Sequence, residues 1–169
     1  MELAYNTEKI RELIEGIKSL PPAGGGGGLP VGVSKLASGT FTPLADIEES
    51  INIAHDLGVE PNFYVVFDET DYSEGSEPGT PLISYALRKP FSERHWNTGE
   101  PQYYACFFID IVFDYGEYIN YNAYNSPADY GADMYDSYFV LYAPCLSDVY
   151  PFKAGHTYRW VCGVIDGVV

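Results

Sequence analysis

Carboxylates are the side chains of this sequence best suited to chemistry, and several of them lie together in the segment DETDYSEGSE. This segment holds Asp68, Glu69, Asp71, Glu74 and Glu77. Carboxylate oxygens at such short spacing are the ligands that Ca²⁺ prefers, but an EF-hand loop of twelve residues needs Gly at its sixth position and Glu at its twelfth. The segment lacks that spacing, so the sequence favours a solvated acidic loop over a calcium site.

A second group of acids lies beside aromatic residues, where glycoside hydrolysis has to be considered. Glycosidases use a pair of carboxylates that flank the bond they cleave, and Asp110, Asp114 and Glu117 have the right chemistry. In a chain with 24 acidic residues such neighbours are common by chance, and spacing along the chain does not show that two of them meet across a cleft. A glycosidase-like enzyme is therefore the least favoured function.

Nucleophilic catalysis and metal binding are disfavoured by the placement of histidine and cysteine. The three histidines lie far apart, and the sequence has no G-x-S-x-G turn to expose a nucleophilic serine. The three cysteines lack the C-x-x-C spacing or the neighbouring histidine of a zinc site, and their apolar neighbours indicate buried core thiols. We therefore expect no enzyme, no metal and no cofactor. The residues concerned are His55, His95, His156, Cys106, Cys145 and Cys162.

The charge balance excludes two classes of partner. A formal net charge of −15 with a pI near 4.3 repels the phosphate backbone of nucleic acid and an anionic membrane surface. No apolar run approaches the roughly 18 residues of a membrane span. The N-terminal sequence MELAYNTEKI lacks the basic and apolar regions of a signal peptide, so we expect synthesis in the cytoplasm.

Tyrosine is unusually frequent between residues 115 and 150. Tyr115, Tyr118, Tyr121 and Tyr124 recur at every third position, interleaved with Asn, Ser, Gly and Asp. That mixture is typical of adaptable contact surfaces, where Tyr supplies rigid area and Asn and Ser supply hydrogen bonds. Three interpretations stay open: a long loop packed by its own aromatics, contact with a neighbouring subunit, and binding of a receptor or glycan.

The first part of the chain predicts a helix over 7–20 followed by a flexible linker. Its apolar residues recur at spacings of three and four and form one stripe, and the run of five glycines after it is a flexible joint. The stripe indicates either a short coiled coil, for which its heptad pattern leans to two strands, or a helix docked on its own domain. The predicted oligomerisation residues are Ile10, Leu13, Ile14, Ile17 and Leu20.

From residue 31 onward the sequence predicts β-strands, rich in β-branched and aromatic residues and bounded by Gly, Pro, Asn or Asp. Many short strands without intervening helices predict an antiparallel β-sandwich or jelly roll. We therefore expect an N-terminal helical segment at 1–22, a linker at 23–30 and a β domain at 31–169, in which 46–50 is the one stretch that could form a short helical turn. The expected strands are Val31–Ser38, Ile51–Ala54, Asn62–Asp68, Leu82–Leu87, Tyr103–Asp114, Tyr138–Tyr142 and Tyr158–Val164.

Residues 37–67 carry one further pattern, in which a Gly-Thr-Phe-Thr-Pro strand precedes a His-x-Leu-Gly-x-x-Pro turn and an apolar strand. This pattern resembles a module of tail-fibre, head-fibre and other appendage proteins of bacteriophages and prophages. Its marks are Thr40, Phe41, Thr42, Pro43, His55, Leu57, Gly58 and Pro61. The turn residues His55, Gly58 and Pro61 are expected to be structural, with a positive φ at Gly58 and a tolerated missing N–H at Pro61.

The resemblance implies a non-enzymatic structural protein of the virion, of fibre or surface-decoration type. In that setting the helix would attach or oligomerise the chain and the β domain would be displayed. The resemblance implies a homotrimer, whereas the heptad pattern leans to a dimer, and both stay open. Expected partners are further copies of the chain and capsid or tail proteins. The alternative function is a host-surface carbohydrate adhesin that binds through the tyrosine-rich segment.

Overall fold

The computed structural model describes residues 12, 16–17, 32–70, 82–88, 97–98, 103–108, 111–114, 117–120, 123–124, 133–142 and 152–166. Within these residues the chain is mainly β, and every strand pair is antiparallel. The strands are β1 (Val33–Phe41), β2 (Ser50–Ala54), β3 (Phe63–Asp68), β4 (Leu82–Arg88), β5 (Tyr103–Phe108), β6 (Ile111–Asp114), β7 (Glu117–Asn120), β8 (Ala123–Tyr124), β9 (Asp133–Met134), β10 (Tyr138–Tyr142) and β11 (Tyr158–Ile165).

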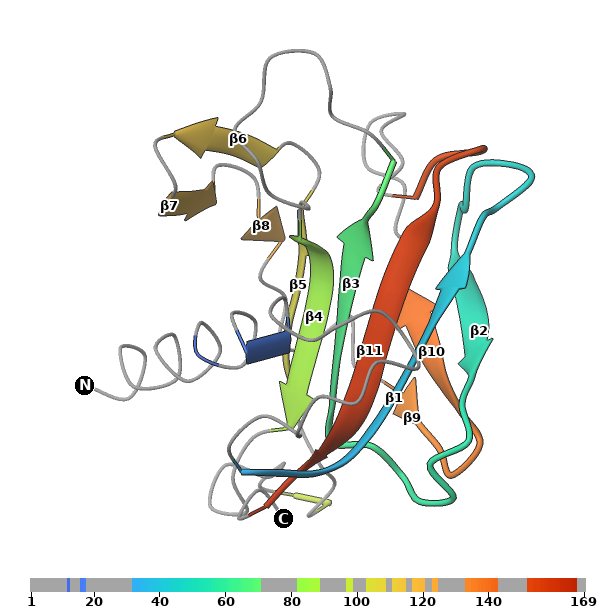
Figure 1. The fold of residues 1–169 in the computed structure, drawn as a ribbon, viewed down its shortest axis with the longest axis vertical. Coiled ribbons are helices and arrows are strands. Elements are labelled where there is room, and N and C mark those ends of the chain that lie inside the picture. Colours follow the sequence, from blue (N-terminus) through green and yellow to red (C-terminus); the bar gives the residue numbers. More distant parts are fainter. Residues whose placement is uncertain are drawn as a thin grey trace.

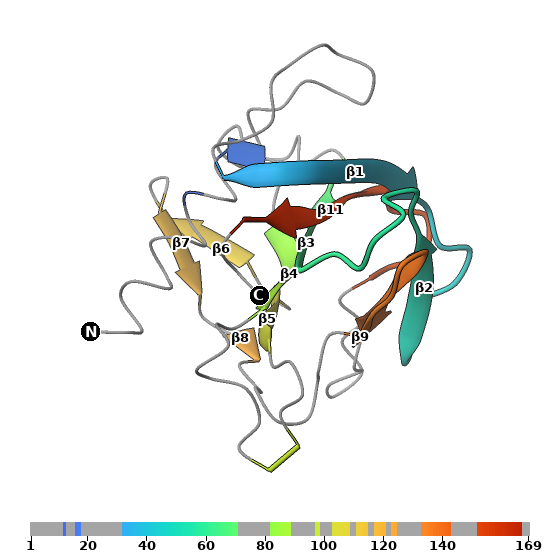
Figure 2. The same ribbon diagram turned by 90° about the horizontal axis from the view of Figure 1, so that it is seen from below.

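The strands form one large sheet and two small ones (Figure 1). The large sheet has six strands in the order β1-β11-β3-β4-β5-β8, the second has three in the order β2-β10-β9, and β6 pairs with β7. The three-stranded sheet and the β6–β7 pair lie on opposite sides of the large sheet, as Figures 1 and 2 show. The C-terminal strand β11 therefore lies between β1 and β3, where it joins the first strand to the middle of the sheet.

One apolar core fills the space between the large sheet and the three-stranded sheet. Alternation along each strand creates it, because neighbouring side chains point to opposite faces. In β10, Phe139 and Leu141 are fully buried, whereas Tyr138 and Val140 are only partly buried. The residues of this core are Ala37, Ile47, Ile53, Tyr64, Val66, Ala86, Met134, Phe139, Leu141, Phe152, Tyr158, Trp160 and Cys162.

A second apolar cluster lies on the opposite face of the large sheet. Strand β3 supplies residues to both clusters, and all six of its residues are buried, which suits its run of aromatic and β-branched side chains. Ile17 belongs to this second cluster and is fully buried. The segment that contains Ile17 thus packs against the β domain of its own chain. The cluster consists of Ile17, Val33, Phe63, Val65, Phe67, Leu87 and Val161.

The predicted strands agree with the observed ones, with several differences at their ends. The predicted strand Tyr138–Tyr142 has the same bounds as β10, whereas Val31–Ser38 begins and ends too early compared with β1. The predicted strand Tyr103–Asp114 is wrong as one element, because it forms two strands, β5 and β6, in different sheets. The short strands β7, β8 and β9 were not predicted.

The predicted helical turn at 46–50 is wrong. Residues 46–49 have no helical structure, and Ser50 begins β2. Asp46 instead uses its carboxylate to accept a hydrogen bond from the Ala154 amide, with 2.8 Å between the oxygen and the nitrogen. The main-chain amide of Ile47 donates to the Phe152 carbonyl at 3.0 Å. Pairing with the segment before β11 therefore satisfies the backbone here in place of a helical turn.

Of the predicted helix at 7–20, the structure describes Glu12, Gly16 and Ile17, and all three are helical. The rest of that helix and the whole glycine linker lie outside the described residues, so the division into 1–22, 23–30 and 31–169 stays a prediction. Within the described part of the chain, no helix is long and apolar enough to cross a membrane.

Candidate functional site

His55 fastens the turn after β2 to the hairpin formed by β9 and β10. Its ring Nε2 lies 3.0 Å from the Tyr135 carbonyl oxygen, and its Nδ1 accepts the Leu57 amide at 3.4 Å. A carbonyl can only accept, so Nε2 carries the proton and the ring is the neutral Nε2–H form. The His55 amide also donates to the Ser137 carbonyl at 2.9 Å, and the ring stacks on Phe139 with 6.5 Å between centroids. Both ring nitrogens are therefore used to hold main chain.

Gly58 and Pro61 shape the same turn in two different ways. Gly58 has φ +69°, the positive value expected at this position, and a Cβ placed there would have no atom within 4 Å. Any residue with a side chain at position 58 would therefore be strained by its backbone and not by a clash. Pro61 is fully buried and stands two residues before β3 begins.

Asn62 joins this turn to the C-terminal end of β11 and was not identified from the sequence. Its side-chain Nδ2 donates to the Ile165 carbonyl at 2.9 Å, and its Oδ1 accepts the Ile165 amide at 2.8 Å. The Asn62 side chain is buried, with 3% of the residue exposed. Because the Asn62 side chain bonds both main-chain groups of Ile165, it extends the ladder between β3 and β11 by one residue. In the sequence Asn62 is marked only by its place directly after Pro61, which does not indicate a partner 103 residues away.

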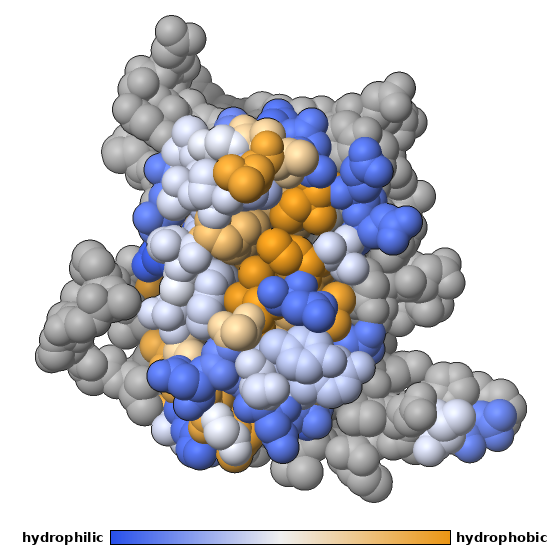
Figure 3. All heavy atoms as spheres, turned by 90° about the vertical axis from the view of Figure 1, so that its right-hand side faces the viewer, coloured by the Kyte–Doolittle hydropathy of each residue, from blue (hydrophilic) through white to orange (hydrophobic). Residues whose placement is uncertain are grey.

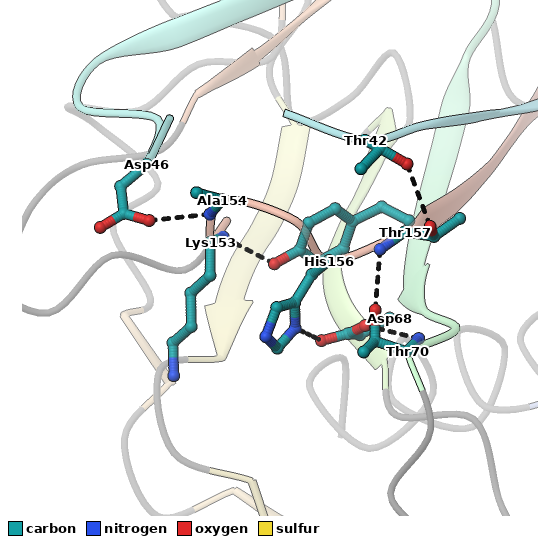
Figure 4. Close-up of polar contacts among 9 residues, drawn as sticks. Thr42, Asp46, Asp68, Thr70, Lys153, Ala154, His156 and Thr157 are labelled. Carbon is teal, nitrogen blue, oxygen red and sulfur yellow. Dashed lines mark hydrogen bonds and ion pairs between the residues drawn. The ribbon is translucent and has the colours of Figure 1, made fainter. Parts of the chain in front are cut away.

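A cluster of polar contacts lies at the end of β3 and the start of β11 (Figure 4). The Nδ1 of His156 is 2.8 Å from Oδ2 of Asp68, and the Asp68 side chain is buried whereas that of His156 is one-third exposed. The other Asp68 oxygen accepts the Thr70 amide at 2.9 Å. We call Asp68 and His156 the Asp–His pair. Asp68 thus departs from the solvated acidic loop expected at 68–77, and residues 71–77 lie outside the described part of the chain.

Three threonines extend this cluster between strands. The hydroxyl oxygens of Thr42 and Thr157 are 3.0 Å apart, and the Thr70 hydroxyl accepts the Thr157 amide at 2.7 Å. The Tyr158 hydroxyl accepts the Lys153 amide at 2.7 Å. Figure 4 shows these contacts converging from the ends of β1, β3 and β11. Each contact satisfies a main-chain or hydroxyl group at a strand end, where sheet hydrogen bonds stop.

The Asp–His pair has the chemistry of an oriented general base, because a carboxylate on Nδ1 fixes the imidazole in one direction. The threonine hydroxyls described nearest to it already bond to one another or to main chain. The arrangement is therefore suited to holding the 152–157 segment against the end of the sheet. Across the residues that the structure describes, no group of three or more His, Cys, Asp or Glu side chains is placed to hold a metal ion.

Phe41, one of the marks of the resemblance, packs into the aromatic residues under this cluster. Its ring stacks on Tyr158 at 5.2 Å between centroids and contacts Phe152 at 6.0 Å. Phe152 in turn meets Tyr158 edge to face at 5.1 Å. Offset and edge-to-face aromatic pairs of this kind stabilise a core beyond the area they bury. The Gly-Thr-Phe-Thr-Pro strand therefore anchors β1 to β11.

The predicted contact surface of tyrosines lies mostly outside the described side chains. Tyr118 and Tyr124 have their main chain in β7 and β8, and nothing further is described of them, while Tyr115 and Tyr121 lie outside the described residues. The exposed tyrosine in the described part is Tyr135, which is 45% exposed. It stacks on Tyr138 with 4.6 Å between ring centroids and 23° between ring planes.

Of the predicted oligomerisation residues, Ile17 alone is described, and it is buried in the cluster on the large sheet. That position fits the docked helix, which was the alternative to a coiled coil. Ile10, Leu13, Ile14 and Leu20 lie outside the described residues, so oligomerisation through this stripe stays a prediction.

No family model, no curated protein and no solved structure matches this chain.

Proposed function

We propose that this chain is a non-enzymatic structural protein of a bacteriophage virion, of fibre or surface-decoration type. The observation that carries the proposal is the use made of His55, the most reactive residue type in the segment that resembles phage appendage modules. Both of its ring nitrogens face main-chain groups, the Tyr135 carbonyl and the Leu57 amide. A histidine committed in this way positions a turn and leaves neither nitrogen for a substrate.

The other marks of the resemblance support the same interpretation. Phe41 packs on Tyr158, Thr42 contacts Thr157, Gly58 supplies a positive φ and Pro61 is fully buried. Each of these residues stabilises the fold. A module in which these characteristic residues are structural suits a protein whose task is to be assembled and displayed.

We further infer that the six-stranded sheet and the three-stranded sheet form a β-sandwich with jelly-roll-like character. The apolar core shared by β3 and β11 of the large sheet and β2, β9 and β10 of the smaller sheet supports this architecture. In the proposed virion setting the helix predicted at 7–20 packs its residue Ile17 against the other face of the large sheet. The other residues of this helix would attach the chain to the particle or to further copies of the chain, which the resemblance implies as a trimer. The partners would be copies of the chain and capsid or tail proteins.

The proposal is tested on phage particles. Lysates from the organism that carries this gene would be banded by density, and the proteins of the intact particles identified by mass spectrometry. The chain is expected in the band at a fixed ratio to the major capsid protein, and to remain there after a high-salt wash. Particles that contain the capsid protein but lack this chain would contradict the proposal, whatever the chain does elsewhere.

A further inference from the structure

The outward face of the three-stranded sheet carries a stacked pair of aromatic residues, Tyr135 and Tyr138, at the turn between β9 and β10. The strand register places Phe139 opposite Met134 and Ile53 on the buried face. The neighbouring positions, among them Tyr135, Tyr138 and Val140, therefore point away from the core. Figure 3 shows this side of the molecule, where an apolar strip borders hydrophilic surface.

Two hydrogen bonds hold the main chain of Tyr135, although nearly half of the residue is exposed. The Tyr135 amide donates to the Tyr138 carbonyl at 2.9 Å, which closes the hairpin turn. The Tyr135 carbonyl accepts a hydrogen bond from the His55 ring. One face of its ring is covered by the stacked ring of Tyr138. The remaining exposed surface is a flat aromatic platform, supported on one side by the Tyr138 ring and carried on a hairpin whose main chain is hydrogen-bonded. A fixed aromatic residue loses little conformational entropy on binding, which favours tight contact.

Two acidic residues border this platform in the chain. Asp133 lies two residues before Tyr135, and Asp136 follows Tyr135 in the hairpin turn; both acids are exposed. Strands β2, β9 and β10 contain no Lys or Arg. The Asp133 carboxylate, followed by the neighbouring Tyr138, raises the pKa of the Tyr135 hydroxyl above its usual value. The platform therefore lies in a negative potential, to which a chain of net charge −15 adds.

A flat aromatic ring beside carboxylates favours one class of ligand, a planar cation. The face of an aromatic ring attracts cations, and a guanidinium group is a planar cation that can lie parallel to the ring while its N–H groups reach carboxylates. An ammonium group has the charge without the flat face, and a neutral sugar ring has a flat face without the charge. Arg and Tyr are also the residue types enriched where proteins meet.

We propose that the exposed face of Tyr135, backed by Tyr138 and bordered by Asp133 and Asp136, binds an arginine side chain of a partner protein. The surface is formed by the hairpin and its attachment to His55, and the partner that it fits is a protein segment that presents an exposed arginine side chain. The inference goes beyond the virion proposal, and either one can fail while the other holds.

The test is a nuclear magnetic resonance titration of the full chain with the peptide acetyl-Gly-Arg-Gly-amide. The comparison ligands are the same peptide with citrulline, which is planar but neutral, the same peptide with lysine, and methyl glycosides of common hexoses. We expect saturable shifts of the Tyr135 and Tyr138 ring resonances with the arginine peptide, weaker ones with lysine and none with citrulline. Added salt should weaken the arginine effect, because exposed charge attraction is screened.

Variants locate the site. Tyr135→Ser should weaken the arginine peptide about threefold to fivefold, the scale of one exposed cation–π contact. Asp136→Asn should weaken it by a smaller factor, and the matched control Glu48→Gln, an exposed acid on another loop, should leave it unchanged. Circular dichroism checks that each variant is folded.

Three results would overturn the inference. The first is absence of saturable shifts at Tyr135 and Tyr138 up to the solubility limit of the arginine peptide. The second is an affinity of Tyr135→Ser for the arginine peptide equal to that of the wild type, which would mean that the peptide is attracted to the acidic surface as a whole. The third is saturable shifts of the same two residues with a hexose glycoside and not with arginine, which would assign the platform to a glycan.

Discussion

His55 and Tyr135 are 80 residues apart in the chain, yet the His55 ring donates a hydrogen bond to the Tyr135 carbonyl at 3.0 Å. The contact joins the turn between β2 and β3 to the turn between β9 and β10. It links a residue of the phage-like pattern to the exposed aromatic platform proposed as a contact surface. Stability of the fold and presentation of that platform therefore depend on one side chain.

Replacing His55 with alanine should destabilise the protein by about 0.5–1.5 kcal/mol, the net contribution of a typical hydrogen bond, because the exposed Tyr135 carbonyl and the partly buried Leu57 amide both lose their partner. Urea unfolding followed by tryptophan fluorescence measures the change. Glu49→Ala, an exposed neighbour in the chain, is the control and should unfold with the wild type. An unchanged unfolding midpoint for His55→Ala would mean that the ring contributes nothing to the turn.

Gly58 should tolerate substitution in an order set by backbone preference. With φ +69° and no atom within 4 Å of a built Cβ, size alone carries no penalty there. Asn adopts positive φ more readily than other residues with a side chain, so Gly58→Asn should cost least. Gly58→Ala should cost more, and Gly58→Val should exceed about 1 kcal/mol because a β-branched residue is most strained at positive φ. Thermal unfolding of the three variants gives the order, and equal costs for Asn and Val would refute the backbone argument.

Ile17 distinguishes a docked helix from an oligomer seam. Because Ile17 is fully buried in the cluster on the large sheet, Ile17→Ala should lower the free energy of unfolding by about 2–5 kcal/mol. Glu12→Ala changes an exposed residue of the same segment and is the control. Light scattering is measured in parallel. A variant that keeps its stability but forms smaller particles would favour the coiled coil, and would show that Ile17 is buried between chains.

The Asp–His pair should show energetic coupling in a double-mutant cycle. Asp68→Asn is expected to cost more than His156→Gln, because the Asp68 side chain is almost fully buried and also accepts the Thr70 amide. The coupling energy should fall between about 0.5 and 3 kcal/mol, as for other residues in direct contact. A cycle between Asp46 and His156, for which no direct contact is described, should give a coupling energy near zero. Equal couplings in the two cycles would mean that the 2.8 Å contact carries no specific energy.

Local sequence signals predicted the strands well and the polar contacts poorly, for a physical reason. The bounds of β10 and the positive φ of Gly58 follow from patterns a few residues long, namely alternation of apolar side chains and the chemistry of a turn. The Asp–His pair joins residues 88 apart, and the Asn62 side chain bonds main chain 103 residues away. No local pattern specifies which distant strand end a polar side chain will meet. The split of 103–114 into β5 and β6 was missed although Asp110 interrupts the apolar run between the two strands, because a single polar residue does not indicate a change of sheet.

Cys162 allows a test of burial through chemistry and pH. Its thiol is fully buried in the core, and this burial, with a smaller contribution from the Asp56 carboxylate, raises its pKa from 9.0 to about 12. At neutral pH the thiol of the folded protein is therefore protonated and shielded, and thiolates are the reactive form. Iodoacetamide should label Cys162 slowly in the native protein and rapidly in urea, as followed by mass spectrometry of the peptide that contains it.

The same shift fixes the sign of a pH effect on stability. Below pH 9.0 the thiol is protonated in both folded and unfolded chains, so the full contribution of the buried thiol is present. Between pH 9.0 and about 12 only the unfolded chain loses the proton, which favours unfolding. The difference in unfolding free energy between the wild type and Cys162→Ala should therefore shrink as the pH rises through this range. Two stability curves that stay parallel, or labelling of Cys162 as fast in the native protein as in urea, would show that the thiol reaches solvent in the folded state.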